Sequence, residues 1–113
     1  LVDETKPIFV AVDGDTVTGY CFCVRKDYRG SGVQTDRVEL YIDDLCVDEN
    51  RRGGGIATAL YRHATDYAKR LGCAFVSLNV WCGNDGAMAF YKKMGLRPRH
   101  IMLEMPLEVE NAE

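Results

Sequence analysis

The 113-residue sequence lacks the features that define several large classes of protein. No apolar run approaches the ~20 residues that a membrane-spanning helix needs, and no signal-peptide pattern opens the sequence. There is no internal repeat, and no linker is long enough to divide the chain. We therefore expect a cytoplasmic protein with no membrane partner, built as a single domain over residues 1–113.

The sequence is also short of basic charge and of metal-ligand patterns. Lys and Arg number 14 against 17 Asp and Glu, so the formal net charge is −3. Surfaces that bind nucleic acids are usually basic, and this composition argues against such a partner. The five cysteines form no C-x-x-C pair and no cysteine–histidine spacing typical of zinc. We expect reduced, mostly buried cysteines and no bound metal.

Turn signals and hydrophobic periodicity predict an α+β fold with the order β-β-β-α-β-α-β. An Asp-Gly pair predicts a hairpin at Asp13-Gly14-Asp15, between strands at Ile8–Val12 and Val17–Val24. A polar loop is expected over residues 25–36. The later elements are a helix over Gly55–Leu71 with His63 on its buried face, a strand over Cys73–Trp81, a helix from Asn84 or Asp85 to Gly95, and a strand over His100–Leu107.

The segment RVELYIDDLCV predicts the third strand, and its alternation changes parity part-way along. Leu40 and Ile42 share one parity, whereas Leu45 and Val47 share the other. A β-bulge at Asp43-Asp44 would place all four side chains on one face. A strand that is buried on both faces explains the same pattern, and the sequence leaves both interpretations open.

Three adjacent glycines, Gly53–Gly55, separate this strand from the first predicted helix. Glycine costs roughly 0.5–1 kcal/mol relative to alanine inside a regular element, so the run needs a physical reason. After a strand and before a helix, backbone N–H groups and the helix dipole can bind a phosphate, and Arg51 and Arg52 can add charge-assisted hydrogen bonds. A P-loop would need G-K-[ST] after its glycines, and a dinucleotide fingerprint would need glycine at Thr58, so neither fits.

The segment RGGGIA, Arg52–Ala57, resembles the pyrophosphate-binding signature of the GNAT superfamily of N-acetyltransferases: Arg or Gln, two variable residues, Gly, one variable residue, then Gly or Ala. The preceding IDDLCVDEN resembles the family's fourth strand. Downstream, NDGAMAFYKKMGL is similar to the family's pattern of Asn, a small residue, an aromatic-Tyr pair and a closing Gly. The resemblance extends from about Ile8 to Leu107. It implies a mixed, mostly antiparallel central sheet flanked by helices, with splayed fourth and fifth strands.

The family normally begins with one more strand and a helical segment, for which the sequence has no room before Ile8. We therefore expect an N-terminally short domain. Such a chain should either associate through exposed sheet or helix surface, as in a homodimer, or belong to a longer protein.

The resemblance implies an N-acetyltransferase that moves an acetyl group from acetyl-coenzyme A, as co-substrate, to a primary amine of a small molecule or protein. The pantetheine arm would pair with the free strand edge at Leu45, Cys46 and Val47. The pyrophosphate would be held by Gly53, Gly54, Gly55, Ile56, Ala57 and Thr58, with Arg52 capping it. Asn84 would hydrogen-bond the co-substrate near the pantetheine, and Tyr91 would contact it near the sulfur.

By the same resemblance, Tyr91 is the general acid, since a phenol can protonate the departing thiolate. Asp43 is the candidate base, directly or through a water, and a structural role for Asp43 and Asp44 stays open. A backbone N–H near Leu45–Val47 is the natural oxyanion donor. Two alternatives share this fold: a truncated acyl-coenzyme-A-binding module with an interaction or regulatory role, and an acyltransferase with a longer acyl donor. The acceptor is left open by the sequence.

Overall fold

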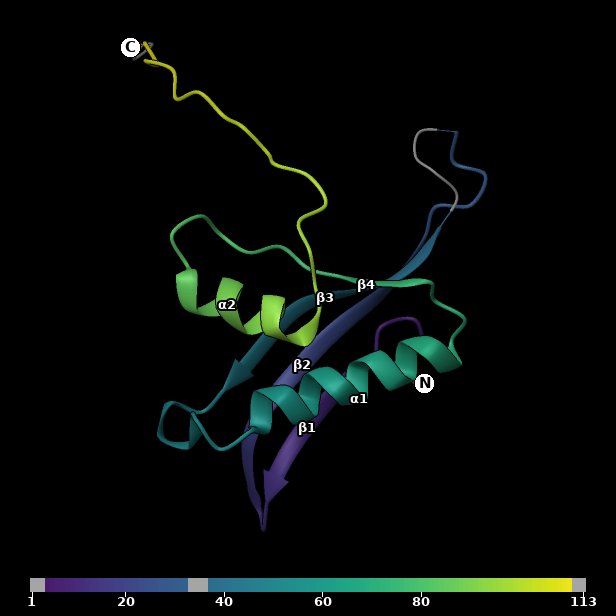
Figure 1. The fold of residues 1–113 in the computed structure, drawn as a ribbon, viewed down its shortest axis with the longest axis vertical. Helices are drawn as coiled ribbons and strands as arrows, with labels where there is room; N and C mark the ends of the chain where they lie inside the picture. Colours follow the sequence, from purple (N-terminus) through teal and green to yellow (C-terminus); the bar gives the residue numbers. More distant parts are fainter. Residues whose placement is uncertain (1–3, 33–36, 111–113) are drawn as a thin grey trace. The chain divides into compact units, whose positions relative to one another are not determined.

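The computed structural model describes residues 4–32 and 37–110 (Figure 1). Its elements are β1 (Ile8–Asp13), β2 (Thr16–Asp27), β3 (Val38–Val47), the 3-10 helix η1 (Glu49–Arg51), α1 (Ile56–Arg70), β4 (Phe75–Ser77) and α2 (Asp85–Met94). These form two compact units, one up to Trp81 and the other from Cys82 onward. Neither helix of the described residues is long and apolar enough to cross a membrane.

The first unit contains a four-stranded sheet in the order β1-β2-β3-β4. The first two pairings are antiparallel, and β4 pairs with β3 in parallel. The predicted hairpin is confirmed, with Gly14 in the left-handed region at φ 61°. The predicted loop over 25–36 began too early, because β2 continues to Asp27, which pairs with Val38. Residues 33–36 of that loop lie outside the described residues.

The core of this unit lies between one face of the sheet and α1. Cys21, Cys23, Leu40 and Ile42 supply the sheet side, and Leu60, Tyr61, Ala64 and Ala68 supply the helix side. Gly19 allows the close approach: a Cβ there would lie 3.0 Å from the Cys46 carbonyl oxygen and 3.1 Å from both Ile56 Cγ2 and Leu60 Cδ1. His63, expected on the buried face, is instead exposed, with its ring edge-on to Phe9 at 4.7 Å. The buried stripe of α1 runs through Tyr61 and Ala68 instead.

The β-bulge in β3 is confirmed. Phe22 lies opposite Asp44 and Cys23 lies opposite Ile42, so Asp43 is the extra residue on β3. Leu45 and Val47 therefore join Leu40 and Ile42 on the α1 side of the sheet. The other interpretation, a strand buried on both faces, also holds at the start of β3, because Val38, Glu39 and Leu40 are all buried there.

Strand β4 is shorter than the predicted Cys73–Trp81. It covers Phe75–Ser77 and pairs only with Glu39–Tyr41 of β3. Among the described residues, β3 beyond Tyr41 therefore has no ladder partner on the β4 side. The two strands separate after three paired residues, which leaves the backbone edge of Leu45–Val47 open.

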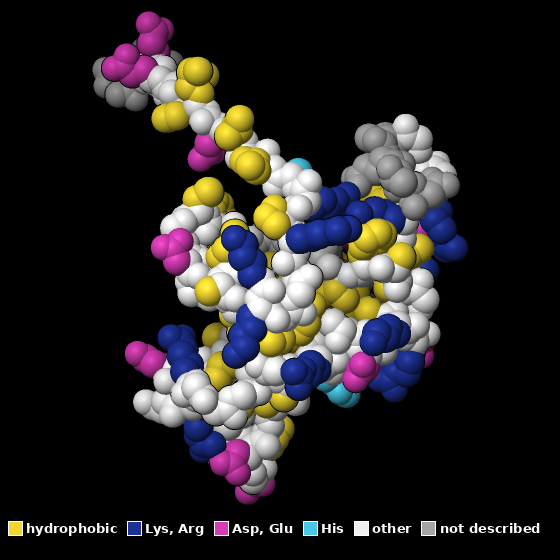
Figure 2. All heavy atoms as spheres, viewed as in Figure 1, with side chains coloured by type: hydrophobic (Ala, Val, Ile, Leu, Met, Phe, Trp, Pro, Cys, Tyr) yellow, Lys and Arg dark blue, Asp and Glu magenta, His cyan; other side chains and the backbone are white. Residues whose placement is uncertain are grey.

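In the second unit, Asn84, one of the two residues predicted to begin the helix, caps α2, since its Oδ1 accepts a hydrogen bond from Ala87 N at 3.1 Å. Gly95 ends the helix at φ 105°. The predicted strand over His100–Leu107 is wrong, because residues 96–110 contain no helix or strand. Figure 2 shows hydrophobic side chains standing out along this segment, where Leu103 is 87% exposed. An extended segment becomes a strand only where a neighbouring edge supplies ladder hydrogen bonds.

Candidate functional site

Hydrogen bonds of Asp48 fix the start of the turn between β3 and α1. Asp48 N donates to Thr18 O at 2.8 Å, which ties the end of β3 to β2. The Asp48 carboxylate accepts from Asn50 N at 3.1 Å, and its carbonyl accepts from Arg51 N at 2.8 Å. These bonds form η1 and fix the direction in which the chain enters the glycine run.

The glycine run has the conformation and the space that a phosphate site needs. Gly53 and Gly55 have φ values of 86° and 85°, in the region that favours glycine. A Cβ at either position would meet no described atom within 4 Å, and at Gly54 it would meet only the Arg51 carbonyl oxygen, at 3.6 Å. Conformation thus requires glycine at Gly53 and Gly55, while the space beside them is open to a ligand.

The start of α1 offers unpaired N–H groups to that space. Gly55 is the N-cap residue and has no side chain to cap the helix. Ala59 N makes the first helical bond, to Gly55 O at 3.0 Å. The structure gives no partner among the described residues to the N–H groups of Ile56, Ala57 and Thr58. Together with the helix dipole, these groups can bind an anion.

The two arginines before the glycines differ in their contacts. Arg51 Nη1 lies 2.6 Å from Asp13 Oδ2 at the end of β1. Arg52 is exposed and makes no ion pair or side-chain hydrogen bond with the described residues. Arg52 is therefore the arginine that can contribute a charge-assisted hydrogen bond to a ligand at the turn.

The second half of β3, Asp43–Val47, contains the candidate base and the open strand edge. Asp43, the bulged residue, is exposed, and Leu45, Cys46 and Val47 are half-buried. Asp44 accepts a hydrogen bond, because Tyr20 Oη donates to its Oδ2 at 3.1 Å. That hydrogen bond and the negative charge of Asp44 raise the pKa of the Tyr20 phenol above its ordinary value.

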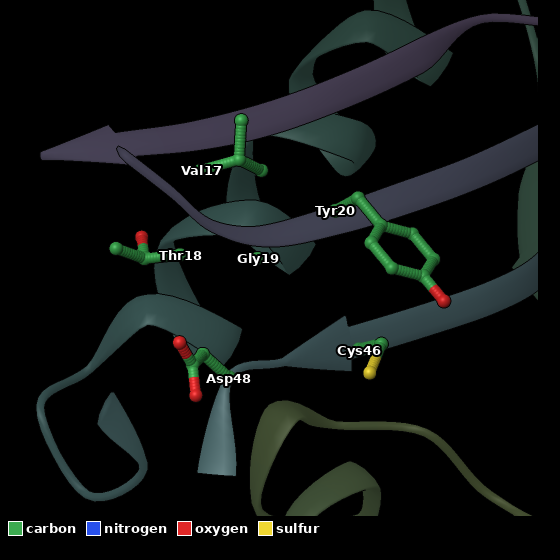
Figure 3. A pocket seen from close by; sticks show the side chains of 6 residues that line it. All are labelled: Val17, Thr18, Gly19, Tyr20, Cys46 and Asp48. Carbon is green, nitrogen blue, oxygen red and sulfur yellow. The ribbon is translucent and has the colours of Figure 1, made fainter. Parts of the chain in front are cut away.

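A hollow lies beside this half of β3 (Figure 3). Its volume is ≈ 270 Å³, and Val17, Thr18, Gly19, Tyr20, Cys46 and Asp48 line it. Figure 3 shows the Tyr20 ring reaching from β2 toward Cys46 on β3. Tyr20 was not among the residues singled out from the sequence, since its place depends on the pairing of β2 with the bulged strand.

The structure therefore groups Asp43, the Leu45–Val47 edge and Arg52–Thr58 in the first unit. Asn84 and Tyr91 belong to the second unit, and each unit is described by itself. Tyr91 is half-buried on α2, with its ring in T-shaped contact with Phe90 at 5.0 Å. Asn84 uses its Oδ1 for the helix cap, so its amide Nδ2 is the atom with which it can donate to a ligand.

Within residues 4–32 and 37–110, no group of three or more His, Cys, Asp or Glu side chains is placed to hold a metal ion. All five cysteines are free; Cys21 and Cys23 are buried, Cys46 and Cys73 are half-buried and Cys82 is exposed. The candidate site consists of the N–H groups at the start of α1, Arg52, the exposed Asp43, the hydrogen-bonded Asp44 and the open edge of β3.

Comparison with known proteins places this arrangement in a family. The model of the acetyltransferase (GNAT) family matches residues 1–96. The chain belongs to this family.

Individual relatives agree with that membership. The chain is 33% identical over 87 residues to N-alpha-acetyltransferase 30 of Schizosaccharomyces pombe, a match that covers 77% of this chain and 55% of the relative. It is 41% identical over 61 residues to an uncharacterised N-acetyltransferase of Methanocaldococcus jannaschii, covering 54% of this chain and 27% of the relative. The chain thus spans about half or less of the length of these relatives.

Comparison with solved structures also agrees with membership of this family. A crystal structure of a mutant BH1408 protein from Bacillus halodurans matches with a TM-score of 0.86 and 33% identity, covering 93% of this chain and 68% of that one. The α+β prediction, with its mixed, mostly antiparallel sheet, is confirmed.

Proposed function

We propose that the chain is an N-acetyltransferase, a single domain over residues 1–113 that transfers an acetyl group from acetyl-coenzyme A to a primary amine. The observation that carries the proposal is the turn before α1. There, unpaired N–H groups, open space beside Gly53 and Gly55 and the unpaired Arg52 come together. Family membership supports the same donor.

The pyrophosphate of the donor fits this turn on physical grounds. The N–H groups of Ile56, Ala57 and Thr58 would donate to phosphate oxygens, and the helix dipole favours negative charge there. Arg52 would add charge-assisted hydrogen bonds. The absence of side chains at Gly53–Gly55 allows the backbone to approach the phosphates closely, which explains the run of glycines.

The remaining donor contacts follow from the open edge of β3. The N–H and C=O groups of Leu45–Val47 that face β4 have no ladder partner among the described residues, so an amide-containing pantetheine arm can pair with them. Asn84 Nδ2 would donate to the same arm. Because β3 leads through η1 into the glycine turn, one continuous stretch of chain would hold both ends of the donor.

Each step of the transfer has a candidate residue. The amine nitrogen forms the new bond to the acetyl carbon, and the carbon–sulfur bond breaks. Asp43 would accept the proton that the amine loses, directly or through water, and its exposure on the bulge makes it accessible. A backbone N–H of Leu45–Val47 would stabilise the negative charge that develops on the carbonyl oxygen. Tyr91 would donate a proton to the departing sulfur.

Calorimetry with acetyl-coenzyme A and an assay of thiol release with added amines test the proposal. We expect Gly55→Glu to abolish detectable binding, because it places bulk and negative charge where the pyrophosphate would lie. Gly72→Glu is the matched control: Gly72 has φ 75°, has open space around its Cβ position and lies after the opposite end of α1. Equal acetyl-coenzyme A affinity in folded Gly55→Glu and Gly72→Glu would refute the assignment of the turn.

The proposal also includes location and assembly. The five free cysteines support a reducing, cytoplasmic compartment. Strand β1 is an edge strand with exposed apolar side chains at Ile8, Val10 and Val12, which supports self-association. Light scattering tests this, and a strictly monomeric, active chain would contradict it.

A further inference from the structure

The face of the sheet that points away from α1 carries an ordered row of cross-strand pairs. Tyr20 lies opposite Cys46, and Phe22 lies opposite Asp44. Gly19, Cys21 and Cys23 point to α1, so the alternate residues of β2 point to the other face. Thr18 and Asp48 continue the row beside the hollow. The row runs along the part of β3 that contains the open edge.

Two aromatic rings form the centre of this row. Tyr20 and Phe22 are stacked, with centroids 4.7 Å apart and an interplanar angle of 29°. The Phe22 residue is 39% exposed. The Tyr20 hydroxyl is held by Asp44, which limits how far the Tyr20 ring can turn. A fixed aromatic surface with a carboxylate beside it is the chemistry that binds an organic cation.

The charged residues in the stretch Asp43–Asp48, beside this row, are all acidic. Asp43, Asp44 and Asp48 form no ion pair with a described residue, whereas the acidic partners of the salt bridges are Asp13, Asp27 and Glu39. None of the residues that line the hollow is Lys or Arg. A cation brought to this stretch would therefore meet carboxylates that no Lys or Arg side chain of the described residues already pairs with.

We infer that this face binds an acceptor amine that carries a second, distal positive charge, with Asp44 and the Tyr20–Phe22 rings holding the distal ammonium. The inference rests on the proposed function and names the substrate class of the same site. Asp44 and Cys46 are two residues apart along β3, a distance of about 7 Å at ~3.3 Å per residue. A chain of about four carbons between two nitrogens spans such a distance, so the reacting amine would reach the Leu45–Val47 edge.

The test compares 1,4-diaminobutane with 1-aminobutane as acceptors for the full chain at saturating acetyl-coenzyme A. The two probes share a reacting amine and differ in the distal ammonium. We expect kcat/KM to favour 1,4-diaminobutane about tenfold, the size of effect that cation–π and partly exposed ion-pair contacts give together. The preference should shrink as ionic strength rises toward 1 M, where the Debye length is about 3 Å.

Three variants connect that preference to the named residues. Asp44→Asn should reduce it to about twofold, and Phe22→Leu should reduce it partly, while the KM for acetyl-coenzyme A stays the same. Asp66→Asn is the matched control, because Asp66 is exposed on α1 and the substitution makes the same change of charge. If Asp44 only ties β2 to β3, Asp44→Asn would lower activity toward both amines equally, and that result would overturn the inference.

The outcomes also separate this inference from the proposed function. Thiol release at equal kcat/KM for the two amines would overturn the inference and leave the function standing. If neither amine supports thiol release, calorimetry with 1,4-diaminobutane alone decides. Binding that Asp44→Asn removes and Asp66→Asn keeps would support the cation site, although neither amine is an acceptor. No binding would overturn the site.

Discussion

Arg51 Nη1 lies 2.6 Å from Asp13 Oδ2, which joins the last residue of β1 to the last residue of η1. The neighbouring Arg52 has no such partner among the described residues. Two adjacent arginines thus have different roles: the first fixes the start of the turn, and the second is free for a ligand. The difference gives a direct test of the site.

Arg52→Ala should weaken acetyl-coenzyme A binding about 10- to 100-fold, the loss expected for hydrogen bonds to a charged group. Arg51→Ala should change the affinity less than about threefold. It should also cost at most about 1 kcal/mol of unfolding free energy, because the Arg51 and Asp13 side chains are 40% and 69% exposed. Calorimetry on both variants provides the comparison. The reverse order of affinities would assign the phosphate contact to Arg51.

Gly19→Ala should destabilise the first unit by about 1–3 kcal/mol, because the added methyl group would lie against the Cys46 carbonyl oxygen and against Ile56 and Leu60 of α1. Urea unfolding, followed by circular dichroism, measures the change. Gly86→Ala on α2 is the control of opposite sign: nothing lies within 4 Å of its Cβ position, and alanine favours a helix. An unchanged midpoint for Gly19→Ala would show that α1 can move away from β2.

Local patterns in the sequence predicted the parts of the fold that local chemistry determines. The change of parity between Ile42 and Leu45 indicated a bulge at Asp43-Asp44 as one of two interpretations, because one extra residue restores the apolar face, and the structure has Asp43 as that residue. The glycine turn was also predicted, and the start of α2 was narrowed to Asn84 or Asp85, since each depends on residues within a few positions. Assignment of ligand-binding roles to these residues came from the family resemblance and stays a prediction.

Strand pairing could not be predicted from local patterns alone. Apolar residues continue past Ser77, yet β4 ends there because it pairs only with Glu39–Tyr41. Ile101, Leu103 and Met105 alternate as strand residues do, but the described structure gives that segment no ladder partner. The Tyr20–Phe22 row was missed for the same reason: its position beside Asp44 depends on the register between β2 and the bulged β3.

The phenol of Tyr20 should titrate at higher pH than an ordinary tyrosine, whose pKa is near 10. The hydrogen bond to Asp44 raises the pKa of Tyr20, and the charge of Asp44 adds to the shift. Because the pKa of Tyr20 is raised in the folded state, the contribution of its protonated hydroxyl to stability is fully present below the unfolded pKa. That contribution is lost as pH rises through the folded pKa. NMR titration of labelled tyrosine, with Tyr20→Phe to assign the signal, measures it. Asp44→Asn should lower the pKa of Tyr20, and no change would show that the Tyr20–Asp44 bond is not formed in solution.

Tyr91→Phe should lower turnover about 10²- to 10⁴-fold while the affinity for acetyl-coenzyme A changes much less, because the substitution removes only the proton donor. The ring contact with Phe90 at 5.0 Å should persist, since phenylalanine keeps the same ring. Tyr28→Phe, in the connection after β2, controls for the loss of a hydroxyl elsewhere.

If the wild-type rate declines at high pH and chemistry limits that rate, the decline should vanish or move in Tyr91→Phe. Stopped-flow measurement of thiol release across pH gives the turnover rate and its dependence on pH. Unchanged turnover under chemistry-limited conditions would leave Tyr91 as a packing residue of α2, and the thiolate would then leave unprotonated or with a proton from water.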